Sequence, residues 1–152
     1  MTSTNTETTE AIMIKQDPKV EQLARFALFS ACSKKELQRL ATIVDRVDID
    51  ADHVLCREGA PARECFFLID GEVQVSIGGR YLGTVGAGEV LGEMALLNRR
   101  PRVATAVTTT RVSTYVIHTS QFRTLVEEMP GIALSLLNTL SDRLAELELA
   151  TA

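Results

Sequence analysis

The chain has 152 residues, of which 45% are apolar and 24% are charged, and its formal net charge is −4. This length predicts one domain with one hydrophobic core. The acidic balance argues against a nucleic-acid partner, which would require a basic face to neutralise phosphates. No apolar stretch approaches the roughly 20 residues needed to cross a bilayer, and residues 1–10 lack the features of a signal peptide. We therefore expect no membrane partner and a cytoplasmic location.

The N-terminal third of the chain predicts a tail followed by helices. Residues 1–17 begin with a Ser-, Thr- and Glu-rich stretch typical of a solvated tail, which we expect to be disordered. Pro18 suits an early helical position, and Val20 to Phe29 carry apolar residues at helical spacing. Ser33 lies three residues before Glu36, a capping-box pattern that opens another helix. We expect helices across residues 18–44.

From residue 45 to residue 118 the apolar period changes to that of strands. The run 73–77 (Val-Gln-Val-Ser-Ile) alternates strictly, and turn residues such as Asp70-Gly71 and Gly78-Gly79 separate the runs. This spacing predicts an antiparallel eight-stranded β-roll, similar to a jelly roll. Helical spacing returns over residues 119–149, where Pro130 separates two helices. The predicted fold is mainly β with flanking helices, in one domain over residues 18–149.

The segment from Gly88 to Thr105 carries the residues with the clearest chemistry. Gly92 allows a backbone to approach a ligand closely, and residues 94–97 can form one helical turn whose N–H groups face an anion. Arg102 can offer its planar fork to a phosphate, and Glu93 can accept a hydrogen bond from a hydroxyl. Taken singly, an Arg or a Glu is usually a surface residue. Their joint spacing favours a site for a compact phosphorylated sugar.

The same segment resembles the phosphate-binding cassette of the cyclic nucleotide-binding domain family. The matching residues are Gly92-Glu-Met-Ala-Leu96 and Pro101-Arg-Val-Ala-Thr105, at the spacing found in the protein kinase A regulatory subunits. The resemblance extends from about residue 28 to residue 147, and also includes the sensor domain of the cyclic AMP receptor protein. It implies a β-roll that binds a cyclic nucleotide and has no catalytic residues.

The resemblance also implies a role for each matching residue. Glu93 would accept from the ribose 2′-hydroxyl, and Arg102 would pair with the cyclic phosphate. The backbone N–H groups of Ala95 and Val103 would complete the anion site. The remaining residues assigned to the ligand are Gly92, Met94 and Ala104 in the cassette, Val75 and Leu82 on the apolar wall, and Arg143 and Leu147 on the terminal helix. Leu91 departs from the family, since many members carry Phe there.

The base preference depends on Val103. Members selective for cyclic GMP often carry Thr at this position, where its hydroxyl bonds the guanine amino group. Val103 has no such group, so we expect cyclic AMP to be preferred over cyclic GMP. The difference corresponds to one hydrogen bond, about 1 kcal/mol.

The terminal helix leaves two interpretations open. Leu137, Leu140, Leu144 and Leu147 step by three, four and three residues, a short heptad seam. This face can pack on the roll, or it can form a homodimer or contact an unidentified effector protein. Ligand binding would favour the helix folded over the pocket. The alternative function is a ligand-free interaction or dimerisation module on the same roll, and the chain fits both a stand-alone sensor and a piece of a larger protein.

Other chemistry is not expected. Cys32, Cys56 and Cys65 lack metal-ligand spacing and are expected to be reduced thiols, and His53 and His118 do not form the paired histidines of a metal-binding cupin. We therefore expect no metal and no enzymatic activity. Arg99 and Arg100 are interpreted as the solvated tip of the cassette.

Overall fold

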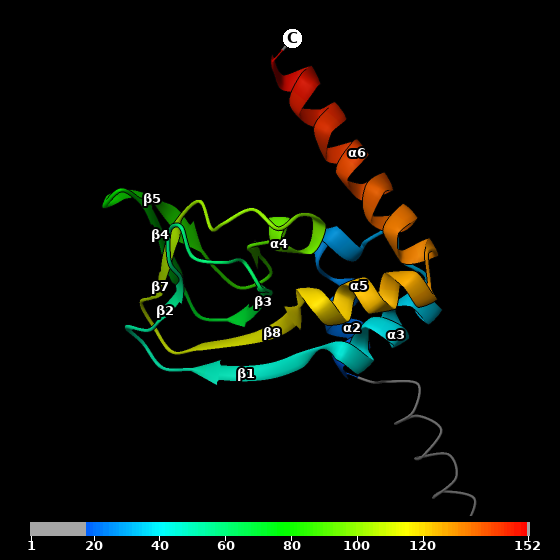
Figure 1. Cartoon of the computed structure of the whole chain (residues 1–152), viewed down its shortest axis with the longest axis horizontal. Coiled ribbons are helices and arrows are strands. Elements are labelled where there is room, and N and C mark those ends of the chain that lie inside the picture. Colours follow the sequence, from blue (N-terminus) through cyan, green and yellow to red (C-terminus); the bar gives the residue numbers. More distant parts are fainter. Residues whose placement is uncertain (1–17, 152) are drawn as a thin grey trace, which may run out of the picture.

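The computed structural model describes residues 18–151, apart from the side chains of Met94 and Thr151. The tail predicted over residues 1–17 lies outside the described residues. Within residues 18–151, three short helical segments come first, followed by eight strands and two C-terminal helices, with one further helical turn, α4 (Met94–Leu97), inserted between the sixth and seventh strands. Figure 1 shows the helices gathered at one end of the sheets.

The N-terminal helices are α2 (Pro18–Ala24), the 3₁₀ turn η1 (Ala27–Phe29) and α3 (Lys34–Ile43). The predicted capping box is confirmed: the Ser33 hydroxyl accepts from the Glu36 N–H, and the Ser33 N–H donates to the Glu36 carboxylate. The prediction of one helix through Phe29 is wrong, because α2 ends at Ala24 and Phe26 adopts an extended conformation. The break lets both Phe26 and Phe29 pack on the Phe67 ring, with centroids 5.3 and 5.0 Å away.

The strands form two antiparallel sheets of four, which confirms the predicted eight-stranded roll. Their orders are β1-β8-β3-β6 and β2-β7-β4-β5. The strands are β1 (Asp45–Ile49), β2 (Val54–Cys56), β3 (Glu64–Asp70), β4 (Val73–Ile77), β5 (Arg80–Val85), β6 (Val90–Leu91), β7 (Thr105–Thr108) and β8 (Val112–His118).

Strand β3 separates two hydrophobic clusters. Cys65 and Phe67 belong to the cluster formed with the helices, whereas Phe66 and Leu68 belong to the cluster between the sheets. Successive side chains of a strand point to opposite faces, so a strand buried on both faces carries a continuous apolar run. This strand therefore anchors the helices and the roll interior to each other.

The C-terminal helices are α5 (Thr119–Glu128) and α6 (Gly131–Thr151). The first part of α6 is packed, since Ile132 and Leu136 are buried, but every residue from 141 to 150 is exposed. Figure 1 shows this outer half projecting away from the sheets. Within the described part of the chain, no helix combines the length and apolar character required to span a membrane.

Candidate ligand-binding site

The segment singled out by the sequence connects β6 to β7. Strand β6 pairs with β3, with Leu91 opposite Phe66, and α4 supplies the predicted helical turn. Within this turn the Ala95 N–H donates to the Gly92 carbonyl at 3.0 Å. The sequence assigned this N–H to an anion, but in the structure it is already hydrogen-bonded.

Arg102 is an interior residue and not a surface arginine. Its Nη2 donates to the Glu64 carbonyl at 2.7 Å and lies 3.5 Å from the Glu64 carboxylate. The guanidinium carbon also lies 6.0 Å from the centroid of the Phe66 ring. The backbone of Arg102 is held as well, because its N–H donates to the Ala60 carbonyl and its carbonyl accepts from Gly59. A guanidinium held in this way is oriented before any ligand arrives.

Gly92 lies directly against Arg102. Its φ of +79° is a conformation that L side chains rarely adopt, and a Cβ placed there would collide with Arg102 Nη1. The glycine is therefore required both by the backbone conformation and by the space that the arginine occupies.

Glu93 faces helix α6. Its carboxylate lies 3.3 Å from Nη1 of Arg143, and the Glu93 side chain is 29% exposed. This ion pair connects the cassette to the start of the projecting half of α6. The structure thus brings Arg143 to the site, where it contacts the carboxylate that the sequence assigned to a ribose hydroxyl.

The thiol of Cys65 is buried, and both Glu93 and Arg102 influence its pKa. Burial, followed by the Glu93 carboxylate, raises the pKa of Cys65 well above its ordinary value, and the Arg102 guanidinium opposes this rise. Both charges therefore act on a single buried thiol. Burial also raises the pKa of Cys56, and Arg102 again opposes the rise.

The remaining predicted residues are distributed unevenly. Val75 and Ala104 are half-buried, and Val75 packs against the cluster between the sheets. Val103 is 78% exposed, Leu147 is 63% exposed and Leu82 is 57% exposed. Leu82 and Leu147 are thus not enclosed with the cassette in this structure. The side chain of Met94 lies outside the described part.

Two residues that the sequence interpretation missed hold the cassette in place. Glu64 binds the guanidinium of Arg102, and the Glu58 carboxylate accepts from the Gly78 N–H at 2.8 Å while contacting the Thr105 hydroxyl. Glu58 thereby joins the β4–β5 turn to the end of the cassette. Both contacts span 20 or more positions along the chain, and no local pattern signals them.

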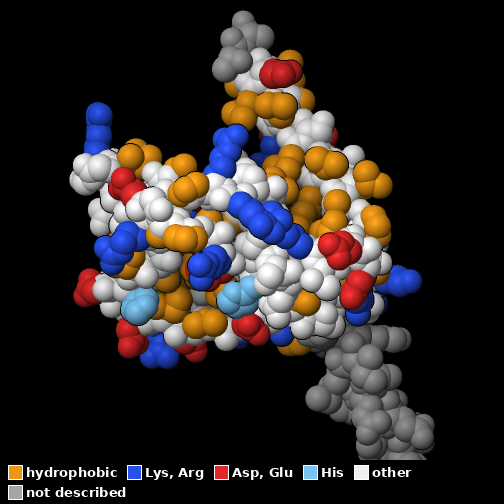
Figure 2. Space-filling model, in the orientation of Figure 1, with side chains coloured by type: hydrophobic (Ala, Val, Ile, Leu, Met, Phe, Trp, Pro, Cys, Tyr) orange, Lys and Arg blue, Asp and Glu red, His pale blue; other side chains and the backbone are white. Residues whose placement is uncertain are grey.

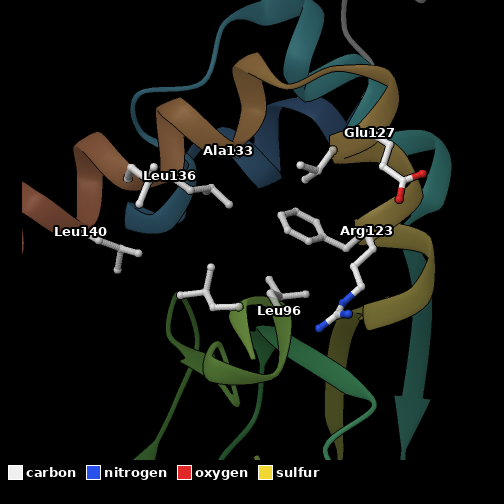
Figure 3. A pocket seen from close by; sticks show the side chains of 10 residues that line it. Leu96, Arg123, Glu127, Ala133, Leu136 and Leu140 are labelled. Atoms are coloured by element: carbon white, nitrogen blue, oxygen red, sulfur yellow. The ribbon is translucent and has the colours of Figure 1, made fainter. Parts of the chain in front are cut away.

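Two hollows border the site. One, of about 570 Å³, opens beside Glu93 and Arg143. The other is an apolar groove of about 440 Å³ between α4, α5 and α6, which Figure 3 shows around Leu96, Leu136 and Leu140. Helix α6 therefore borders both hollows.

Comparisons with known proteins agree with this geometry. The family model described as "Cyclic nucleotide-binding domain" matches residues 46–129. A cyclic nucleotide-gated potassium channel of Mesorhizobium japonicum is 32% identical over 111 residues, which is 73% of this chain and 31% of the channel. A CRP-like cAMP-activated global transcriptional regulator of Mycobacterium tuberculosis is 27% identical over 82% of this chain and 58% of the regulator. The acetyltransferase Pat of Mycolicibacterium smegmatis is 32% identical over 81% of this chain and 38% of the enzyme.

Solved structures share the fold. The N-terminal domain of a Streptomyces coelicolor transcriptional regulator superposes with a TM-score of 0.75 at 24% identity, over 83% of this chain and 94% of that one. A cyclic nucleotide-binding-like protein of Brucella abortus superposes with a TM-score of 0.65 at 29% identity, over 73% of this chain and 99% of that one.

The chain spans less than two thirds of the curated relatives named above. The family model covers more than half of the chain, from strand β1 through the cassette to the end of α5. The chain belongs to the cyclic nucleotide-binding domain family.

Proposed function

We propose that the chain is a sensor module that binds cyclic AMP in preference to cyclic GMP and catalyses no reaction. In this proposal Arg102 pairs with the cyclic phosphate and Glu93 accepts from the ribose hydroxyl. The observation that carries the proposal is the buried guanidinium of Arg102, oriented by Glu64 and lying against Gly92. An arginine is rarely buried unless it is paired; Glu64 pairs with this one, which lies in the segment that resembles the family's phosphate-binding cassette.

Binding would rearrange two contacts of the ligand-free site. A phosphate bonded to the Ala95 N–H would replace the Gly92 carbonyl as its acceptor, and a ribose hydroxyl on Glu93 would compete with Arg143. The carboxylate has two oxygens and can keep both partners, in which case Arg143 would lie directly beside the ligand. Either outcome connects ligand binding to α6.

We further propose that α6 moves when the ligand binds. The groove between α4, α5 and α6 leaves room for such a shift, and the leucines that line it can slide without exposing polar groups. Every residue from 141 to 150, the outer half of α6, is exposed, so this half can fold over the nucleotide with the loss of few buried contacts. A ligand that binds better to the folded-over state would shift the population toward it.

A second candidate function is dimerisation through α6. Leu137 and Leu144 are each 58% exposed, and Leu147 is 63% exposed, on a helix whose outer half projects away from the sheets. A homodimer would bury this seam with or without a nucleotide. Sedimentation equilibrium without ligand tests it. An apparent mass that rises from the monomer to the dimer value as protein concentration increases supports the dimer, and a constant monomer mass contradicts it.

Titration calorimetry with cyclic AMP and cyclic GMP tests the sensor proposal. We expect saturable binding of both nucleotides, tighter for cyclic AMP. The exposed Val103 offers guanine no hydrogen-bond partner, so Val103→Thr should improve cyclic GMP affinity by up to about tenfold, one hydrogen bond's worth, with little change for cyclic AMP. An unchanged ratio would remove the argument for base preference. No heat at millimolar concentrations of either nucleotide would favour the ligand-free module.

A further inference from the structure

A third hollow lies apart from the residues assigned to the nucleotide. This cavity, of about 630 Å³, is formed by the loop before β3, the cassette loop and the first turns of α5. Its basic lining residues are Arg63, Arg99, Arg123 and His118. Figure 2 shows basic side chains gathered across the middle of this face of the molecule.

The three arginines have no acidic partner within the part of the chain that the structure describes. Among residues 18–151, no ion pair or hydrogen bond engages the guanidinium of Arg63, Arg99 or Arg123, whereas other basic residues of the same region are paired. Glu127 lies one turn after Arg123 on α5, but Figure 3 shows the Arg123 side chain reaching toward Leu96 and away from Glu127. Three like charges therefore share one cavity without a counterion from the described chain.

The acidic residue that lines the cavity is already engaged. Glu64 lines it, but its carboxylate lies 3.5 Å from Arg102 and its carbonyl accepts from the same guanidinium. Asp45 lies 3.7 Å from the imidazole of His118. The cavity is consequently positive on a chain whose net charge is −4. A cleft lined by positive side chains attracts anions, even on a protein whose net charge is negative.

The walls of the cavity are held in place. The Thr119 N–H donates to the Arg63 carbonyl at 2.9 Å, and the Thr119 hydroxyl donates to the carbonyl of Ala95 in α4 at 3.1 Å. These bonds connect the loop that carries Arg63, the cassette and the start of α5. Ser120 and Gln121 add neutral hydrogen-bonding side chains to the lining. The segments that carry the residues lining the cavity are thus hydrogen-bonded to one another.

The charge and size of the cavity select the class of ligand. A volume of a few hundred Å³ is that of a small-molecule site, and guanidinium groups bind phosphate oxygens in a bidentate manner. Three arginines match a dianionic phosphate better than a single carboxylate. They are too few for duplex nucleic acid, which is bound by neutralising many phosphates in a row.

We propose that this cavity is a second anion site, which binds a phosphate monoester through Arg63, Arg99 and Arg123. It is separate from the nucleotide site, because Arg102 is buried and does not line it. The phosphate can come from a free phosphorylated small molecule or from a phosphorylated side chain, and both present the same dianionic group.

Amide chemical shifts of the ¹⁵N-labelled chain, titrated with inorganic phosphate and with O-phosphoserine, test the proposal. We expect saturable shifts at Arg63, Arg99, Ser120 and Gln121 with both probes, and none there with serine. Tighter binding of O-phosphoserine would assign the site to phosphate esters, and equal affinities would assign it to the phosphate group alone.

Variants separate this site from the nucleotide site. Replacing Arg63 and Arg123 together by Gln should weaken phosphate binding at least about tenfold, since two charge-assisted contacts are lost. Arg80→Gln, on the exposed edge of β5, should leave it unchanged. Shifts confined to Gly92, Ala95 and Arg102 would mean that phosphate binds only at the nucleotide site, and would overturn the proposal. So would affinity unaffected by the double substitution, or no saturable shift at tens of millimolar phosphate.

Discussion

At the scale of single residues, the site depends on the contact between Gly92 and Arg102. The guanidinium occupies the space that a side chain at residue 92 would need. Arg102 can be buried because the Glu64 carbonyl accepts from it and because residue 92 has no side chain. A buried guanidinium without such partners would carry a large desolvation cost. The cassette therefore holds the guanidinium of Arg102 in the interior, oriented for an anionic ligand.

Gly92→Ala tests this arrangement, with Gly79→Ala as its matched control. Both glycines have nearly the same positive φ, +79° and +78°, but a Cβ at residue 79 would meet nothing within 4 Å. We expect each variant to lose about 1–2 kcal/mol of unfolding free energy from backbone strain. Only Gly92→Ala should also displace Arg102 and weaken cyclic AMP binding, by about tenfold or more.

Chemical denaturation and calorimetric titration of the two variants measure these effects. Equal cyclic AMP affinities for Gly92→Ala and Gly79→Ala would mean that the contact between Gly92 and Arg102 has no part in binding.

The sequence was sufficient to single out these residues but not their neighbours. Gly92, Glu93 and Arg102 lie within eleven positions and carry a recognisable spacing. Glu64 precedes Arg102 by 38 positions and contributes a main-chain oxygen, which any residue type could supply. Arg63, Arg99 and Arg123 likewise come from three separate segments, and only the fold brings them to one cavity. The sequence interpretation of Arg99 as part of a solvated tip did not anticipate that grouping.

At the scale of elements, α6 is one continuous helix whose two halves differ in burial. Its first turns are anchored by Ile132 and Leu136, which are essentially inaccessible, whereas residues 141–150 are all exposed. The Glu93–Arg143 ion pair lies near the boundary between the halves. Since such a partly exposed ion pair contributes little free energy, breaking it would add little to the cost of the proposed movement of α6.

Leu136→Ala and Leu144→Ala compare the two halves of α6. We expect Leu136→Ala to lower the unfolding free energy by about 2–5 kcal/mol, because it leaves a cavity in the core. Leu144→Ala should change it by no more than about 0.5 kcal/mol, as for an exposed position. Urea denaturation measures both values. Comparable losses for the two variants would show that the outer half is packed in solution, as a dimer through α6 requires.

The periodicity of the sequence predicted which elements exist, but it did not predict where α2 ends or what packs on α6. The capping box and the alternation in β4 are local signals, and both correspond to observed elements. The end of α2 at Ala24 is not a local signal, because it depends on Phe67, some forty residues away, which accommodates Phe26 and Phe29. The leucine spacing of α6 defines a face, but a face alone does not indicate what covers it.

At the scale of the whole molecule, the two sheets and the helices meet at the cassette. The assignment of residues 18–149 to one domain stays a prediction, and so do the individual ligand contacts. The structure nevertheless arranges the four charged or conformationally special residues around one place: Gly92 beneath Arg102, and Glu93 against Arg143. We propose that Arg102 provides the charge that holds the nucleotide.

Calorimetric titration of cyclic AMP into the parent chain and into Arg102→Leu tests that claim most directly, with Arg99→Leu as the control for loss of a cassette arginine. We predict that Arg102→Leu loses about 2–5 kcal/mol of binding free energy, the cost of truncating one partner of a buried charge pair. Arg99→Leu should bind within about 0.5 kcal/mol of the parent, because Arg99 is exposed and is not among the residues assigned to the nucleotide. A folded Arg102→Leu chain that binds cyclic AMP as tightly as the parent would contradict the proposal that Arg102 pairs with the cyclic phosphate.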